Sequence, residues 1–357
     1  MRYRKGCQYS SEPVGFSGGC GGSSSRCQSS HAWTAALGVF VLVLFSFSTN
    51  RQDAKSSDSG DLDSHLVEGG QSIHVLPGAP GMVSIPAGTF IMGADLRERN
   101  NLESACANEM HSQLVAEEIC SWSNAILVGL ATAPPERRVF LHGYDIDVLE
   151  ATTGDYRRCV VAGGCSPLPL AVGDTRYARD DWPMVNVTWA EAQQFCQWRG
   201  ARLPTEAEWE KAARGTDGRR WPWGNADQRD RADRGMALPE AILPPPSMAY
   251  LPIAFAPDPG DGAKILVSPG VFSWSRSPYG LFDMTGNVAE WVADWFSEDG
   301  YAGMPTVDPR GPQSSALIYR GVRGGHFELP SFMCRTYFRS WARPETRAYS
   351  RGFRCAR

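Results

Sequence analysis

The chain has 357 residues, 42% of them hydrophobic, and contains 12 Trp, 37 Gly and 25 Pro. This length allows one large domain or two small ones, and the composition suits a compact, loop-rich globular protein. The formal net charge is only −4, so charge gives no reason to expect nucleic acid or an anionic membrane surface as a partner.

The first predicted element is an uncharged, mostly apolar segment, residues 31–50, which follows the basic residues Arg2, Arg4 and Lys5. Its densest part has the length of a signal-peptide hydrophobic region, and the whole segment approaches the roughly 20 residues that span a bilayer. Basic residues on its N-terminal side predict that the rest of the chain is exported. We therefore expect residues 1–50 to be a cleaved signal peptide or a signal anchor, with the remainder in the periplasm or cell envelope.

The next segments predict a linker followed by one folded domain. Residues 51–80 are rich in Ser, Asp and Gly and are expected to form a flexible linker. The domain is predicted to span 81–357. It opens with GMVSIPAGTFIMGA, in which β-forming and turn residues alternate as in a hairpin or paired strands, and 139–149 alternates again as a strand does.

Three helices are predicted next. Thr153 is expected to cap a short helix that ends at a glycine pair. Two more helices follow back to back, and each begins with a capping box. The two boxes pair Thr188 with Glu191 and Thr205 with Glu208. Helices early in the domain, followed by short strands and long ordered loops, predict an α+β fold.

Seven cysteines follow the apolar segment, and an odd number leaves at least one of them unpaired or paired between chains. An oxidising compartment favours disulfides for the others. Cys159 and Cys165 lie close enough in sequence for a helix end to fold back and join them. Cys106 and Cys120 lie within residues 95–135, which lack a clear period, so we expect them to close an inserted loop.

The segment SPYGLFDMTGNVAEW, residues 277–291, is the most specific in the chain. Asp283, Asn287 and Glu290 place three oxygen-bearing side chains within eight positions, and glycines between them permit tight turns. Hard cations such as Ca²⁺ prefer these ligands together with main-chain carbonyls. The spacing is not that of an EF-hand, so Asp283 and Glu290 can also be read as turn caps without a metal.

Six segments in this order resemble the formylglycine-generating enzyme family, also called sulfatase-modifying factors. They are MVSIPAGTFIMGA, VTWAEAQQFCQWRGARLPTEAEWEKAARG, WPWGN, YGLFDMTGNVAEW, RGG and GFRCAR. The resemblance covers residues 81–357. It implies a fold related to C-type lectins, poor in regular secondary structure and stabilised by calcium and disulfides. The family's activity is the copper-dependent oxidation, by O₂, of a sulfatase cysteine to formylglycine.

The resemblance also implies where calcium would bind. One calcium site falls on the side chains of Asp283 and Glu290 and the carbonyls of Gly286 and Val288. The nearest matches to a second calcium site are Asp233 and Asp261, with an insertion around them.

A disulfide is implied in the same way. The family pairs the cysteine of the "FC" helix with that of the terminal GFRC, which here are Cys196 and Cys355. Such a bridge would close a very long loop of the unfolded chain.

Active members of the family carry two cysteines, spaced C-x4-C, after the glycine pair, and both thiolates bind copper because soft sulfur selects Cu(I). Counted from Gly325, the first position holds Leu329 and the second Cys334. Counted from the arginines downstream, the loop is shorter and Cys334 falls outside the reactive pair. Because both alignments lack the pair, we expect Cys334 to be a buried, unreactive thiol outside any disulfide.

Two functions remain open at this stage. The first is an exported, non-catalytic protein of the cell envelope that binds a protein, peptide or glycan, with calcium as its cofactor and with a membrane contact only through residues 31–50. The alternative is an oxidase with altered ligands, in which Cys334 and His326 would hold copper. Against this alternative, His326 can equally be a side chain that fills a partly buried strand.

Overall fold

A computed structural model describes most of the chain after residue 72. The described residues are 73–74, 81–100, 135–167, 177–232, 234–237, 255–257, 266–297, 301–312 and 318–357. They all lie within one unit, Ser64–Arg357. The predicted signal or anchor segment and nearly all of the predicted linker lie outside the described residues. No helix within the described part is long and apolar enough to cross a membrane.

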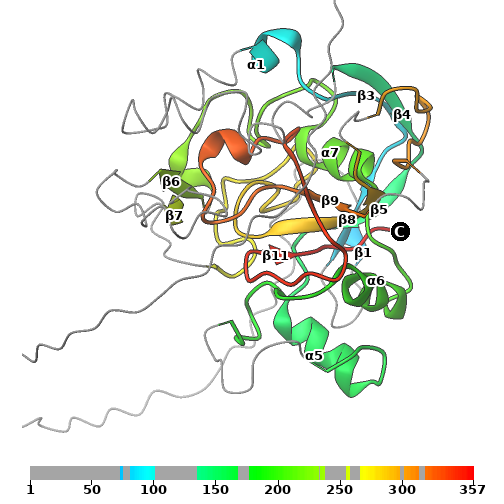
Figure 1. Cartoon of the computed structure of the whole chain (residues 1–357), viewed down its shortest axis with the longest axis vertical. Coiled ribbons are helices and arrows are strands. Elements are labelled where there is room, and N and C mark those ends of the chain that lie inside the picture. The colour runs from blue at the N-terminus through cyan, green and yellow to red at the C-terminus, as the bar shows by residue number, and fades with distance from the viewer. Residues whose placement is uncertain are drawn as a thin grey trace, which may run out of the picture. The chain divides into compact units, whose positions relative to one another are not determined.

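The described strands form four small sheets (Figure 1). One has the order β1-β2-β5, and its strands are Ile73–His74, Met82–Ile85 and Tyr144–Asp147. A second joins β3 (Gly88–Met92) to β4 (Arg137–Leu141), and a third joins β6 (Gly235–Ala237) to β7 (Phe255–Pro257). The largest has the order β10-β9-β8-β11, with strands Arg339–Ala342, Arg320–Arg323, Ala289–Trp295 and Arg351–Gly352.

The first two strands of the domain are paired strands, as one predicted alternative has it, but they do not form the hairpin of the other. β2 pairs with β5 and β3 pairs with β4, so β2 and β3 do not pair with each other. Pro86, which has no N–H for a ladder, stands between β2 and β3. The predicted strand 139–149 is likewise two strands, because the chain leaves one sheet for the other at Gly143. Alternation marks a strand, but it does not identify the strand that pairs with it.

A short strand precedes the predicted start of the domain at residue 81. Ile73 and His74, which fell in the predicted linker, pair with Val83 and Met82 as an outer strand.

Four α-helices are described: α1 (Leu96–Asn100), α5 (Thr153–Val161), α6 (Trp189–Trp198) and α7 (Glu206–Arg214). Both predicted capping boxes are present, at the starts of α6 and α7. The cap of α5 is Thr152 and not the predicted Thr153. Thr152 has extended backbone and accepts from the main-chain nitrogen of Asp155, whose side chain accepts in return. The prediction overlooked this box because its third residue is Asp, where the usual pattern has Glu or Gln.

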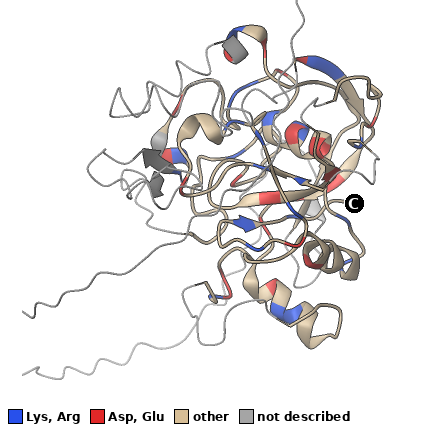
Figure 2. Ribbon diagram, in the orientation of Figure 1, with Lys and Arg blue, Asp and Glu red and all other residues tan. Residues whose placement is uncertain are grey.

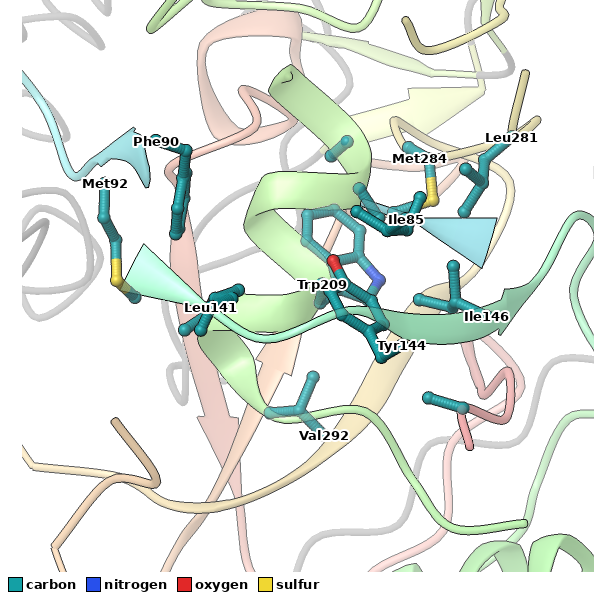
Figure 3. Packing of buried hydrophobic residues seen from close by; sticks show 14 of the residues in the cluster. Ile85, Phe90, Met92, Leu141, Tyr144, Ile146, Trp209, Leu281, Met284 and Val292 are labelled. Atoms are coloured by element: carbon teal, nitrogen blue, oxygen red, sulfur yellow. The ribbon is translucent and has the colours of Figure 1, made fainter. Parts of the chain in front are cut away.

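Helix α7 supplies the centre of one hydrophobic core. Trp209 is fully buried among side chains of the two neighbouring small sheets, including Phe90, Leu141 and Tyr144 (Figure 3). Tyr144 donates its hydroxyl hydrogen to the carbonyl oxygen of Glu208 at 2.6 Å, so the polar end of that buried ring has a partner. These contacts hold α7 against β3 and β4.

Two of the predicted disulfides are present. Cys159 bonds to Cys165, and Cys196 of α6 bonds to Cys355 across 159 residues of sequence. In the chain-entropy account, closing so long a loop stabilises the fold by about 5 kcal/mol.

Candidate functional site

Buried charges on α7 hold strand β9 in place. This strand leads into Gly324 and Gly325, called here the glycine pair. Glu206 accepts from Arg339 Nε at 2.7 Å and from Arg323 Nη1 at 3.0 Å. Glu210 accepts from Arg323 Nη2 at 2.7 Å and from Arg214 Nη1 at 2.8 Å. Figure 2 shows acidic and basic positions side by side along this helix. Arg323 directly precedes the glycine pair, so its two bonds to α7 set where that pair begins.

Two buried arginines balance the negative charge of Glu206. Burial opposes its ionisation, but Arg339 and Arg323 outweigh that effect and lower its pKa to about 2. The carboxylate is therefore ionised at neutral pH, and it anchors the ends of β9 and β10 to α7.

Residues 283–290, called here the TGN segment, turn sharply before β8. Asp283, Gly286 and Asn287 have φ angles of 55°, 80° and 54°, a left-handed conformation that Gly, Asn and Asp tolerate best. Asn287 is held by its amide, which donates to Glu150 Oε2 at 2.6 Å, while its Oδ1 accepts from the main-chain nitrogen of Val267 at 3.1 Å. These hydrogen bonds offset the cost of the unusual backbone.

Three buried carboxylates lie at this segment and share one guanidinium. Arg354 donates to both oxygens of Glu290, at 2.7 and 2.6 Å. Asp283 Oδ2 accepts from the main-chain nitrogen of Gly270 at 2.5 Å. Burial raises the pKa of Asp283 to about 6. Burial and then repulsion from Asp283 and Glu290 raise the pKa of Glu150 well above its ordinary value.

This imbalance fits the charge of a bound cation near Asp283. The fit of the ligands is less complete, because Glu290 already accepts from Arg354 and from Trp209 Nε1. No three His, Cys, Asp or Glu side chains gather around a possible metal position in the described ranges. A calcium ion here would therefore depend on the carbonyls of Gly286 and Val288 as well as on the two carboxylates, as the family resemblance implied.

The loop of residues 324–334, called here the glycine-pair loop, is hydrogen-bonded to the TGN segment. Gly324 and Gly325 both have left-handed φ angles, 93° and 69°. The carbonyl of Gly324 accepts from Gly286 N at 3.0 Å, and Phe327 N donates to the carbonyl of Asn287 at 3.0 Å. The two segments therefore form one continuous piece of ordered backbone.

Cys334 is fully buried at the end of this loop and is not in a disulfide. Its Sγ packs so closely on Gly325 that a Cβ at that position would collide with it. The thiol donates to the carbonyl of Leu329 at 3.6 Å, and Phe332 beside it is also buried. The sulfur is therefore enclosed by its own loop.

His326, the other residue of the copper alternative, has different partners. Its Nδ1 accepts from the main-chain nitrogen of Glu328 at 3.3 Å, and its ring lies edge-on to that of Phe327. Burial, and then the nearby Arg351, lower its pKa to about 4. The imidazole is therefore neutral at pH 7 and uses one of its nitrogens within the loop.

The structure also has a surface hollow that the sequence analysis missed. Its volume is about 520 Å³. Its walls come from the segment after α7, from the end of the short 3-10 helix Arg229–Arg231 and from a loop before the TGN segment. The lining residues are Arg219, Pro222, Trp223, Arg231, Ser273, Trp274, Arg276, Ser277 and Pro278. The sequence signal that could have indicated this hollow is tryptophan close to arginine in each of the two segments 219–223 and 273–278.

Four predicted site residues lie outside the described residues: Asp233 and Asp261 of the second calcium site, and Cys106 and Cys120 of the third disulfide.

Comparison with protein families gives a match to the "Sulfatase-modifying factor enzyme 1-like domain" over residues 74–357. The formylglycine-generating enzyme of Thermomonospora curvata is 30% identical over 310 residues, which cover 78% of this chain and 93% of that protein. The enzyme of the same name from Streptomyces coelicolor is 35% identical over 217 residues, covering 59% of this chain and 64% of that protein. A bovine protein named "Inactive C-alpha-formylglycine-generating enzyme 2" is 39% identical over 129 residues, covering 36% of this chain and 38% of that protein.

Solved structures match over most of the chain as well. PvdO from Pseudomonas aeruginosa has a TM-score of 0.55 and 22% identity, and the match covers 78% of this chain and 94% of that one. Treponema denticola variable protein 1 has a TM-score of 0.53 and 20% identity, covering 81% and 99%. At these identities the likeness establishes the fold alone. It confirms the predicted α+β fold class.

Proposed function

The chain belongs to the sulfatase-modifying factor enzyme 1-like family, and from that premise we propose that it is an exported, non-catalytic binding protein of the cell envelope. Its ligand is a protein, a peptide or a glycan. The observation that carries the proposal is the state of Cys334. This is the one cysteine of the glycine-pair loop, and it is buried against Gly325 and Leu329.

The chemistry of the family explains why that observation matters. Holding Cu(I) and admitting a substrate thiol requires two soft sulfur ligands on the protein. Counted from Gly325, the other position of the pair holds Leu329, whose aliphatic side chain cannot ligate a metal. Its carbonyl oxygen accepts from the one thiol present. A thiol buried among apolar neighbours is also poorly accessible to a substrate or an oxidant.

The test is an assay of the full chain with a sulfatase-type cysteine peptide, added copper and O₂, followed by mass spectrometry of the peptide. We expect no conversion to formylglycine, while the Thermomonospora curvata enzyme converts the same peptide in parallel. Leu329→Cys should not restore turnover, because the new thiol would still face a buried partner. Turnover by the wild-type chain that Cys334→Ala abolishes would overturn the proposal.

The alternative is a copper-dependent oxidase with altered ligands, and the similarity to two proteins named formylglycine-generating enzyme favours it. Under this alternative, Cys334 and His326 would hold the copper, and replacing either should remove both copper binding and turnover. Copper content and turnover, measured on the same preparations, separate the two functions.

We also propose that the exported domain binds one calcium ion at Asp283 and Glu290. The excess of buried carboxylates over guanidinium groups at the TGN segment supports this proposal, because a divalent cation would reduce their mutual repulsion.

A further inference from the structure

We propose that the hollow lined by Trp223, Trp274 and three arginines binds an acidic sugar, a pyranose that carries a carboxylate. This inference rests on the proposed binding function, since it names the class of ligand. The hollow uses no residue of the glycine-pair loop. A failure of the sugar assignment would therefore leave the question of catalysis untouched.

The walls of the hollow are tied together by hydrogen bonds. Arg231 Nη1 donates to the carbonyl of Trp274 at 3.3 Å, which joins the 3-10 helix to the opposite loop. That loop is shaped by turns in which Ser277 Oγ accepts from the main-chain nitrogen of Leu281 at 3.2 Å. The volume of about 520 Å³ lies within the range of small-molecule sites. The hollow is therefore preformed and large enough for a short oligosaccharide.

The charges in the hollow favour an anion. Arg219 is neutralised by Asp217, which accepts from Arg219 Nη2 at 2.7 Å. Arg231 and Arg276 have no acidic partner among the described residues, and the guanidinium of Arg276 lies 4.8 Å from the centre of the Phe282 ring. Two guanidinium groups that no described carboxylate neutralises suit an acidic ligand, because a carboxylate can accept two parallel hydrogen bonds from one guanidinium.

The aromatic side chains favour a sugar ring as the carrier of that charge. Trp274 is 70% exposed, an unusual position for so large an apolar surface. The Trp223 ring is nearly parallel to that of Trp221, at 6.4 Å between centroids, and its Nε1 donates to the carbonyl of Ala226. Its plane is therefore fixed. The apolar C–H face of a pyranose can pack on such indole surfaces and remove them from water.

An acidic peptide fits the hollow less well. No described strand lines it, so a peptide would find no sheet edge to extend. The exposed residue Ser273 and the aromatic faces of Trp223 and Trp274 match the alternating polar edge and apolar face of a sugar. We therefore take the peptide as an outcome of the test and the acidic sugar as the proposal.

The test measures binding to the full chain by isothermal titration calorimetry and by quenching of tryptophan fluorescence. The probes are trigalacturonate and a hyaluronan tetrasaccharide, with neutral galactotriose and hexaglutamate as comparisons. We expect at least one acidic sugar to bind more tightly than about 1 mM, and more weakly as salt rises. Trp274→Ala and Arg276→Ala should each weaken it about tenfold or more. The control Arg343→Ala removes an exposed arginine elsewhere and should change affinity less than about twofold.

Three results would overturn the proposal. They are the absence of binding by both acidic sugars, equal affinity for galactotriose, and hexaglutamate binding as tightly as the acidic sugars. Thermal melting of each variant checks that it is folded, and both substituted positions are exposed. The formylglycine assay on the same wild-type preparation tests the non-catalytic proposal separately.

Discussion

At the scale of single residues, the glycine pair shows how sequence restricts local structure. Gly325 combines a left-handed φ of 69° with close contact to Cys334. Only a residue without Cβ satisfies both conditions. This requirement is independent of catalysis, so Gly325 is needed for packing whether or not the loop has an enzymatic role.

Gly325→Ala should therefore cost much more stability than another left-handed glycine changed to alanine. Gly163 has a similar φ of 73°, but a Cβ there would meet nothing within 4 Å. We expect Gly163→Ala to lower the free energy of unfolding by about 1 kcal/mol, and Gly325→Ala by about 2 to 3 kcal/mol more, since the clash adds to the strain. Urea unfolding of both variants measures the difference. Equal losses would contradict the packing of Cys334 on Gly325.

The buried Asp294 leads to a prediction about pH, because few groups around it stabilise its charged form. Its Oδ2 accepts from Glu206 N at 2.8 Å, while Oδ1 has no hydrogen-bond partner among the described residues. Burial and then Glu206, with a smaller contribution from Glu208 and against the attraction of Arg339, raise its pKa to about 8. The native state therefore holds a proton that the unfolded chain releases near pH 4, so stability falls as pH rises between these values.

Asp294→Asn cannot titrate and should lose this dependence on pH. The free energy of unfolding of the variant minus that of the wild type should increase from about pH 4 to about pH 8, by up to about 1.4 kcal/mol per pH unit, and level off above that range. Urea unfolding at several pH values measures this difference. A constant difference across the range would show that Asp294 does not carry the raised pKa.

At the scale of secondary structure, local sequence signals predicted where helices begin better than they predicted which strands pair. The boxes at Thr188 and Thr205 were visible because a cap and its reciprocal acid lie three residues apart. The pairing of β2 with β5 could not be predicted from the sequence. Alternation within 81–94 is the same for a hairpin and for two strands in separate sheets. Local chemistry specifies a helix start, whereas strand pairing depends on distant sequence.

The cap of α5 offers a test of this local chemistry. Thr152→Ala should remove the acceptor for Asp155 N and lower the free energy of unfolding by about 1 kcal/mol. Thr152→Ser keeps the hydroxyl and should stay within about 0.5 kcal/mol of the wild type. Thermal unfolding of the two variants compares them directly. If serine and alanine cost the same, the hydroxyl does not act as the cap.

At the scale of the whole molecule, the candidate site combines predictable and unpredictable parts. The glycine pair, Cys334 and the TGN segment were identifiable because each is contiguous in sequence. The charge network was not: Arg323 meets Glu206 from 117 positions away, and Arg354 meets Glu290 from 64. Nothing local marks an arginine as buried, since the same residue type is usually at the surface.

Calcium should stabilise the whole domain if the TGN segment binds it. Binding to the native state alone raises the free energy of unfolding by about 2.7 kcal/mol when free calcium is 100 times the Kd. Asp283→Asn is the sharper variant, because asparagine keeps an oxygen for Gly270 N while removing the charge. Glu290→Ala would instead leave Arg354 buried without its partner.

We therefore expect added calcium to raise the melting temperature of the wild-type chain and a chelator to lower it. In Asp283→Asn the same additions should have much less effect, because a neutral amide binds Ca²⁺ more weakly than a carboxylate. Magnesium at equal concentration serves as the control, since Mg²⁺ requires near-ideal octahedral geometry and gives up its waters reluctantly. Equal calcium-dependent shifts in the wild type and Asp283→Asn would exclude Asp283 as a ligand. The repulsion among Glu150, Asp283 and Glu290, which share one guanidinium, would then lower the stability of the fold without being reduced by a cation bound at Asp283.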